Sequence, residues 1–413
     1  MSTADFLTNL FGNYYNDNFD RIISPSNLRK REFGFMFFKY GSIIRHLSFE
    51  DENQLKTFLA REAPSDVFYS AAYYFQPAMP KMPMKGWEGC DLIFDIDADH
   101  IETSCKNEHD KWKCQVCGKA DKGIKPDKCP VCGESKIEEL KWLCDTCLDY
   151  AKLETIKIVE DFLIPDFGLS KSEIGICFSG HRGYHIHVES EVVKELNSQA
   201  RREIIDYIKG GGIDPELHGL QEIGRKKVIT GPDTNDKGWG GRITRNVIKF
   251  ISKLQENEII MEDKYTKKKL LMLIKEKQKI INSLSQHPPL WDAMRNIDIN
   301  FWFLIVERAI NMAKGKIDEP VTADIHRLIR LPTSINGKTG FQVKPLKLNE
   351  IASFDPFSDS QIFEGQITVR AGDVPTFRIG EETFGPYKDE KVELPLSAAV
   401  FLLCKGVAQI LKT

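Results

Sequence analysis

Residues 90–99 read Cys-Asp-Leu-Ile-Phe-Asp-Ile-Asp-Ala-Asp, and the expected fold is organised around this stretch. The apolar residues from Leu92 to Ile96 predict a short buried strand that Asp95 and Asp97 interrupt. Because side chains alternate across a strand, a spacing of two places both carboxylates on one face. Two like charges are costly to bury unless a cation lies between them, and Mg²⁺ prefers such oxygen ligands. The stretch predicts a divalent metal site, although a strand that runs into a solvated acidic turn gives the same pattern.

The length, charge and hydropathy of the chain limit the classes of protein that it can belong to. The chain has 413 residues, enough for two or three domains with a substantial core. Its net charge is only -3, so a nucleic-acid surface would have to be a local basic patch. We expect no membrane span, because the sequence has no run of eighteen apolar residues. The start also lacks a signal peptide, which together with the missing span predicts a cytoplasmic protein.

The cysteines indicate metal binding. Six of them form three C-x-x-C pairs, a pattern that favours metal over disulfides in a cytoplasmic protein. Two pairs have the spacing of a zinc ribbon and predict a closed tetrahedral Zn²⁺ site. Four further residues flank this ribbon and suggest a second site, with ligand exchange between the sites, or a non-ligating Cys105 or His109, as alternatives. The first set is Cys114, Cys117, Cys129 and Cys132, and the second is Cys105, His109, Cys144 and Cys147.

The segment Ser179-Gly-His-Arg-Gly-Tyr-His185 follows a predicted strand over residues 173–178. Its two glycines let the backbone approach a phosphate, and Arg182 offers a bidentate fork. Ser179 can donate a hydroxyl, and His181 or His185 an imidazole N–H. The segment predicts an anion cradle. The alternative is a strand turn whose histidines bond to their neighbours.

A third polar cluster lies in residues 324–330. Asp324 is either a third metal-binding carboxylate or a helix N-cap. Arg327 and Arg330 are three residues apart, so we expect one helical turn to bring them together. Three acids and a phosphate cradle fit nucleotidyl transfer at two metal ions.

These motifs together resemble the small catalytic subunit of archaeal and eukaryotic-type DNA primases. The resemblance covers roughly residues 1–190 and 300–345, with the pieces in the family order. It rests on Arg31-Glu-Phe, Phe94-Asp-Ile-Asp97, the cysteine cluster, Ser179-Gly-x-Arg-Gly-x-His185, and Asp324 followed by Arg-Leu-Ile-Arg-Leu-Pro-x-Ser.

The resemblance implies roles for individual residues. Asp95, Asp97 and Asp324 would bind two catalytic Mg²⁺ or Mn²⁺ ions, while Ser179, Arg182 and His185 would bind the nucleotide triphosphate. Arg330 would lie near that nucleotide, and Arg31 at the rim of the site. The matching zinc knuckle is Cys105, His109, Cys144 and Cys147, so the four-cysteine ribbon is an addition. The chain departs from the family pattern at His181 and Asn336, with Lys338 as a compensating charge.

By the same resemblance we expect an α+β protein, a mixed α/β primase fold with an inserted zinc-binding module and a helical subdomain. The catalytic core would comprise residues 1–103, 148–190 and 299–413, the zinc module 104–147 and the helical subdomain 191–298. Within these parts we expect a hairpin from residues 31–38 and 42–49. Further predicted elements are helices over 50–62, 148–164, 264–283, 300–314 and 394–411, with strands after residue 341.

The implied activity is template-directed synthesis of short RNA primers from NTPs on single-stranded DNA, for DNA replication at the nucleoid. The implied partner is the large primase subunit, which carries an iron–sulfur cluster, in a heterodimer without membrane contact. Three other interpretations stay open. They are a metal-dependent phosphoesterase or nuclease that uses His185 and His187, a non-catalytic zinc-ribbon scaffold, and the primase–polymerase domain of bacterial end-joining systems.

Overall fold

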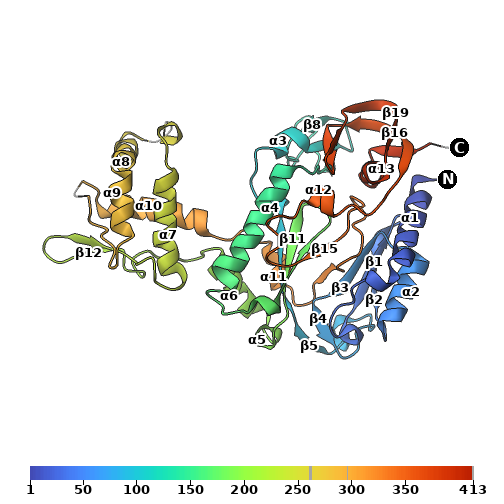
Figure 1. Ribbon diagram of the computed structural model, residues 1–413, viewed down its shortest axis with the longest axis horizontal. Coiled ribbons are helices and arrows are strands. Elements are labelled where there is room, and N and C mark those ends of the chain that lie inside the picture. The colour runs from blue at the N-terminus through green and yellow to red at the C-terminus, as the bar shows by residue number, and fades with distance from the viewer. Residues whose placement is uncertain (260–262, 295, 412–413) are drawn as a thin grey trace. The chain divides into compact units, whose positions relative to one another are not determined.

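The computed structural model describes residues 1–259, 263–294 and 296–411, and it divides the chain into two compact units (Figure 1). The first unit comprises residues 1–156, 170–202 and 317–413, and the second residues 157–169 and 203–316. The mixture of helices and several sheets confirms the predicted α+β class.

The acidic strand lies at the edge of a four-stranded antiparallel sheet in the first unit. The order is β15 (Lys344–Leu346), β10 (Ile174–Phe178), β11 (Gly183–Val188) and β6 (Leu92–Asp97). Phe94, Ile96 and Ile186 are fully buried, so apolar burial fixes which face of each strand turns to the core. The resulting register pairs Asp95 with His185 and Asp97 with Gly183.

A second four-stranded sheet has the order β14 (Leu328–Arg330), β3 (Asp66–Ser70), β1 (Phe33–Phe37) and β2 (Tyr40–Leu47). The β1–β2 pairing confirms the predicted hairpin. Helices α1 (Thr3–Asp17) and α2 (Glu52–Glu62) pack on each other, and α2 reaches β1 through rings of Phe58 and Phe35 whose centroids are 4.7 Å apart. The predicted helical turn with Arg327 and Arg330 is wrong, because residues 328–330 pair as a strand with β3.

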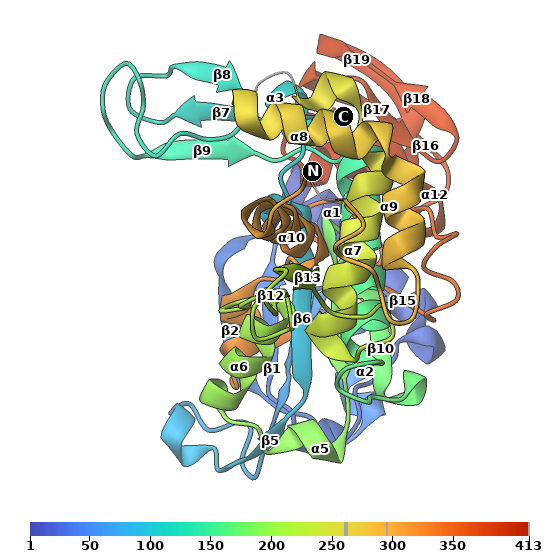
Figure 2. The ribbon, with the colours of Figure 1, turned by 90° about the vertical axis from the view of Figure 1, so that its left-hand side faces the viewer.

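The cysteine-rich insertion forms its own small sheet, with the order β8 (Ala120–Lys122), β7 (Lys111–Cys114) and β9 (Ile137–Leu140). Figure 2 shows these strands side by side, projecting from the first unit. The insertion begins with α3 (Lys106–His109) and ends where α4 (Asp145–Lys157) starts, so Cys147 lies in the first turn of α4. The predicted insertion therefore folds around a sheet of its own within the first unit.

The C-terminal part combines a sheet with one buried helix. Strands β16 (Gln366–Val374), β19 (Tyr387–Pro395) and β20 (Ala408–Ile410) pair in the order β19-β16-β20. Helix α13 (Leu396–Cys404) is buried over residues 397–403. The predicted helix over 394–411 is too long, because Gly406 adopts a φ of 71° and ends it before β20.

The second unit is largely helical. The long helix predicted for residues 264–283 is instead two helices, α8 (Lys264–Lys275) and α9 (Lys277–Leu284). They accompany α7 (Gly238–Lys253) and α10 (Ile299–Ala313), which pack on each other, and the hairpin of β12 (Gln221–Ile223) and β13 (Val228–Thr230). Helix α6 (Ser198–Ile208) begins in the first unit and ends in the second.

The remaining elements are short. They are β4 (Ala72–Tyr74), β5 (Trp87–Cys90), α5 (Glu191–Lys194), α11 (Glu319–Ala323), α12 (Pro356–Asp359), β17 (Phe377–Ile379), β18 (Glu382–Phe384), the π-helix Ile158–Leu163 and 3₁₀ turns at Phe19–Arg21, Leu28–Lys30, Met82–Met84, Ala98–His100, Lys171–Glu173 and Glu256–Ile259. Within the described ranges, every helix is too short or too polar to cross a lipid bilayer.

Candidate active site

Strand β6 carries the two acids predicted to bind metal. Burial raises the pKa of Asp95 to about 7, and the charges of Asp97 and Asp318 add to this effect. The pKa of Asp97 is also raised, first by burial and then by Asp99. Both shifts show that ionised carboxylates are disfavoured here without a counter-charge. A divalent cation would supply that charge.

A third carboxylate approaches this pair from Asp318, which precedes α11. Its main-chain N–H donates to the main-chain oxygen of Asp95 at 3.0 Å, and its Oδ2 lies 3.7 Å from Nε2 of His100. The Asp-Glu-Pro sequence marks a helix start, with Asp318 as N-cap, but nothing local indicates that this start lies beside β6.

Asp324, the carboxylate that the family resemblance pointed to, lies at the opposite end of α11. It is exposed, and its Oδ1 accepts the main-chain N–H of His326 at 2.8 Å. Among the described residues, no hydrogen bond or ion pair joins it to Asp95 or Asp97. Of the two ends of α11, the structure thus places Asp318 rather than Asp324 beside Asp95.

The acids open into a cavity of about 220 Å³ within the first unit. Its walls come from β6, from the turn between β10 and β11, and from β14 with the loop that follows. Carboxylates and cations share this cavity, which suits a ligand with both metal ions and phosphates. The lining residues are Phe68, Asp95, Asp97, Ser179, His181, His185, Arg327, Leu328, Ile329, Arg330, Asn336 and Lys338.

The two histidines of β11 have different surroundings. His185 lies opposite Asp95, with Nε2 3.7 Å from Oδ1, and burial holds its pKa well below the usual range. Nδ1 of His187 lies 3.2 Å from the Tyr69 hydroxyl, and this side chain does not line the cavity. Only His185 is therefore placed to meet a ligand beside Asp95.

His181 lines the cavity beside Lys405, whose side chain is half-buried. Nζ of Lys405 donates to Nε2 of His181 at 3.0 Å and to the main-chain oxygen of Lys141 at 2.9 Å. Burial and the charge of Lys405 hold the pKa of His181 well below its usual range, so the imidazole is neutral. Lys405 belongs to the segment after residue 345, which the family resemblance does not cover.

The loop after β14 brings further polar groups to the cavity. Arg330 forms an ion pair with Asp66, and its guanidinium lies 5.0 Å from the centre of the Phe68 ring. Asn336 is fully buried. Its amide nitrogen donates to the main-chain oxygen of Ser179 at 2.9 Å, and its Oδ1 accepts the main-chain N–H of Lys338 at 3.0 Å. Asn336 thus holds the loop against the predicted cradle with both of its polar atoms.

Two arginines do not reach the cavity. Arg182 is fully buried and pairs with Asp99 at 3.0 Å and with Asp110 at 3.1 Å. Arg31 is equally buried and pairs with Asp91 at 2.7 Å. The phosphate contact of Arg182 and the rim position of Arg31 stay predictions, and in this structure both guanidinium groups pair with acidic side chains instead.

Both cysteine clusters assemble as the sequence spacing predicts. In each, one ligand atom from every residue lies within 4.8 Å of the others, which fits one Zn²⁺ ion per cluster. Gly118 and Gly133 follow the two ribbon pairs with φ of 76° and 75°, a turn that favours glycine. In the other cluster, Asp110 Oδ1 holds Nδ1 of His109 at 2.8 Å and so leaves Nε2 facing the thiols. This carboxylate support is typical of zinc-binding histidines.

Some site residues were not selected from the sequence. Asp318, Phe68 and Lys405 carry no motif, so only the tertiary fold places them here. Arg327 belonged to a recognised cluster, but its place in the cavity wall depends on the pairing of β14 with β3.

Comparison with known proteins identifies the family of this chain. A family model described as DNA primase small subunit matches residues 126–348. The chain is 33% identical to the DNA primase small subunit PriS of Methanothrix thermoacetophila over 99% of both chains. It is 33% identical to PriS of Nitrosopumilus maritimus over 98% of both chains, and 31% identical to that of Methanococcoides burtonii over 99% of both. The chain belongs to the DNA primase small subunit family, whose members are nucleotidyltransferases.

Proposed function

We propose that this chain is the catalytic subunit that joins NTPs into RNA primers on a single-stranded DNA template, by nucleotidyl transfer at two metal ions. The observation that carries the proposal is one cavity lined by the carboxylates of Asp95 and Asp97, the polar side chains of Ser179 and His185, and the cations of Arg327, Arg330 and Lys338. A third carboxylate, that of Asp318, lies close enough to raise the pKa of Asp95.

The carboxylates fit Mg²⁺ or Mn²⁺. Asp95 and Asp97 lie on one strand face, and the raised pKa of each marks a site that lacks positive charge. Oxygen donors of this kind suit hard divalent ions. When bound, two such ions would activate the attacking hydroxyl and stabilise the leaving pyrophosphate.

The chain's other residues would hold the triphosphate. Arg327 and Lys338 line the cavity, and no ion pair in the described part of the chain occupies either of them. Ser179 offers a hydroxyl from the turn after β10, and the neutral rings of His181 and His185 each offer one N–H. The guanidinium of Arg330 lies over the Phe68 ring and adds positive charge, which its ion pair with Asp66 partly offsets.

A partner subunit follows from the family rather than from this chain alone. The relatives are named as small subunits, which implies a large one. We therefore propose a heterodimer with a large primase subunit.

The phosphoesterase interpretation finds less support in this geometry. It requires His185 and His187 as ligands of one metal site together with Asp95 and Asp97. His187 instead lies against Tyr69 and outside the cavity.

The test is primer synthesis on single-stranded DNA with labelled NTPs and Mg²⁺ or Mn²⁺, with the large subunit present. Wild type should form labelled oligonucleotides, and Asp97→Ala should form none. Product from the variant at the wild-type rate, or no product from either protein, would overturn the proposal.

A further inference from the structure

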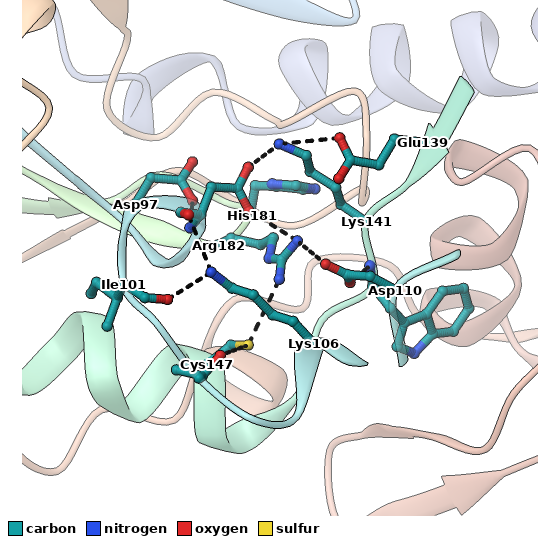
Figure 3. Close-up of polar contacts among 12 residues, drawn as sticks. Asp97, Ile101, Lys106, Asp110, Glu139, Lys141, Cys147, His181 and Arg182 are labelled. Carbon is teal, nitrogen blue, oxygen red and sulfur yellow. Dashed lines mark hydrogen bonds and ion pairs between the residues drawn. The ribbon is translucent and has the colours of Figure 1, made fainter. Parts of the chain in front are cut away.

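A buried network of charges lies between the cluster of Cys105, His109, Cys144 and Cys147 and the end of β6 (Figure 3). At its centre is Arg182, whose Nη1 lies 3.0 Å from Oδ1 of Asp99 and 3.1 Å from Oδ2 of Asp110. The side chain of Arg182 is 0% exposed and that of Asp110 is 4% exposed. A guanidinium so enclosed by acids is held in one position.

Asp110 and Arg182 both contact candidate zinc ligands. Asp110 Oδ1 lies 2.8 Å from Nδ1 of His109 and also accepts the main-chain N–H of Trp142 at 2.9 Å. Nη2 of Arg182 lies 3.7 Å from Sγ of Cys147. Three thiolates and a neutral imidazole around Zn²⁺ carry net negative charge, which Arg182 would offset.

On the other side, the network reaches a candidate catalytic carboxylate. The main-chain N–H of Asp99 donates to Oδ1 of Asp97 at 2.8 Å. The main-chain oxygen of Arg182 accepts the N–H of Ala98 at 3.0 Å, and Lys141 pairs with the second oxygen of Asp99. The turn that orients Asp97 is therefore fastened to Arg182 through both its main chain and a side chain.

Taken together, these contacts form one chain of direct interactions. It runs from His109 and Cys147 through Asp110 and Arg182 to Asp99, and from there to Asp97. Among the described residues, the ribbon of Cys114, Cys117, Cys129 and Cys132 has no comparable contact with β6. The two clusters thus differ in their connection to the cavity.

We propose that Arg182 is a positioning residue that couples the Cys105–Cys147 zinc cluster to Asp97, and is not a ligand of the nucleotide phosphates. The proposal rests on the proposed function for the role of Asp97 itself. Loss of the guanidinium leaves the buried Asp110 without its arginine partner and leaves Asp99 with Lys141 alone, so the support of His109 and the turn at Asp99 should both loosen.

The experiment compares wild type with Arg182→Met in the full chain bound to the large subunit. Three quantities are measured: the rate of zinc release to a chelator, Mn²⁺ affinity by calorimetry, and kcat and KM for NTP. The variant should release zinc about 10- to 100-fold faster, the usual effect of losing support around metal ligands. It should also bind Mn²⁺ about tenfold more weakly and lose kcat, since small misplacements cost up to about 100-fold in rate. KM should change less than about threefold.

Two further variants control for general damage. Arg242→Met removes another buried arginine, paired with Asp166 in the second unit, and should leave zinc release and Mn²⁺ affinity at wild-type values. Asp110→Asn removes one charge with little change of shape and should also speed zinc release and weaken Mn²⁺ binding. It provides the same test where Arg182→Met fails to fold.

A different outcome would assign Arg182 to the phosphates. A rise in KM of about tenfold or more, with zinc release and Mn²⁺ affinity unchanged, would overturn the proposal, because a lost charged hydrogen bond to substrate has that size. Zinc release is read without primer synthesis, so its result is separate from a failure of the proposed function.

Discussion

The main-chain N–H of Asp318 donates a hydrogen bond to the main-chain oxygen of Asp95 at 3.0 Å. This bond fixes the start of α11 against the middle of β6, and it brings the Asp318 carboxylate close enough to raise the pKa of Asp95. The position of this third acid beside Asp95 is therefore set by a main-chain contact between two distant parts of the sequence.

Asp95 should make the stability of the metal-free protein depend on pH. Its folded-state pKa of about 7 lies above the ordinary 3.8, so the folded state binds the proton more tightly than the unfolded state. Stability should thus fall as pH rises from about 4 to about 7. The full effect is up to roughly 4 kcal/mol, at about 1.4 kcal/mol per pKa unit.

The neutral variant Asp95→Asn should escape this loss. In buffer without Mg²⁺ or Mn²⁺, its Tm should match that of wild type near pH 4 and exceed it at pH 8. A Tm difference that stays constant between these pH values would show that Asp95 does not titrate in this range.

Lys405 should produce the opposite trend. Burial, followed by the charges of Arg182 and Lys338, lowers its pKa from 10.5 to about 7. The folded state therefore binds this proton less tightly than the unfolded state does. The cost of burying the charge is full below pH 7 and disappears as pH rises to about 10.5.

Lys405→Met should accordingly be more stable than wild type at pH 6, by roughly 2 to 4 kcal/mol on the pKa scale. This advantage should vanish by about pH 10, as measured by urea unfolding. Equal stabilities at pH 6 would contradict a buried, charge-disfavoured lysine beside His181.

Substitutions of the two histidines of β11 should differ in their effect on primer synthesis. His185→Asn should lose about tenfold or more in primer synthesis, because the ring lies beside Asp95 in the cavity. His187→Asn should keep activity within about threefold and lose about 1 kcal/mol of stability with the Tyr69 hydrogen bond. Equal losses of activity would favour a metal site that uses both histidines.

Arg31 should matter for stability rather than for nucleotide binding. Arg31→Met leaves Asp91 buried without its partner and should cost about 3 to 5 kcal/mol. The double variant with Asp91→Asn should recover part of this loss, and KM for NTP should stay unchanged in both. A raised KM in a stably folded variant would return Arg31 to the rim of the site.

Local patterns predicted only part of this site. The spacing of Asp95 and Asp97, and of the two cysteine clusters, is a property of neighbouring residues, so the sequence alone could place them. The choice between Asp318 and Asp324 depends on which end of α11 meets β6, and the residue types do not record that. The glycine-rich sequence around Arg182 is typical of a phosphate ligand, yet Arg182 pairs with Asp99 and Asp110 in the folded chain. The spacing of Arg327 and Arg330 also suits a helix, but residues 328–330 form a strand because they pair with β3.

We place the proposed nucleotidyl transfer beside Asp95, Asp97 and Asp318. The most direct measurement is primer synthesis by Asp318→Asn and Asp324→Asn, assayed beside wild type with Mn²⁺ and the large subunit. Both substitutions keep the side-chain size and remove one carboxylate from opposite ends of α11. The account predicts that Asp318→Asn loses at least about 100-fold in rate, while Asp324→Asn remains near wild type. An active Asp318→Asn with an inactive Asp324→Asn would contradict it.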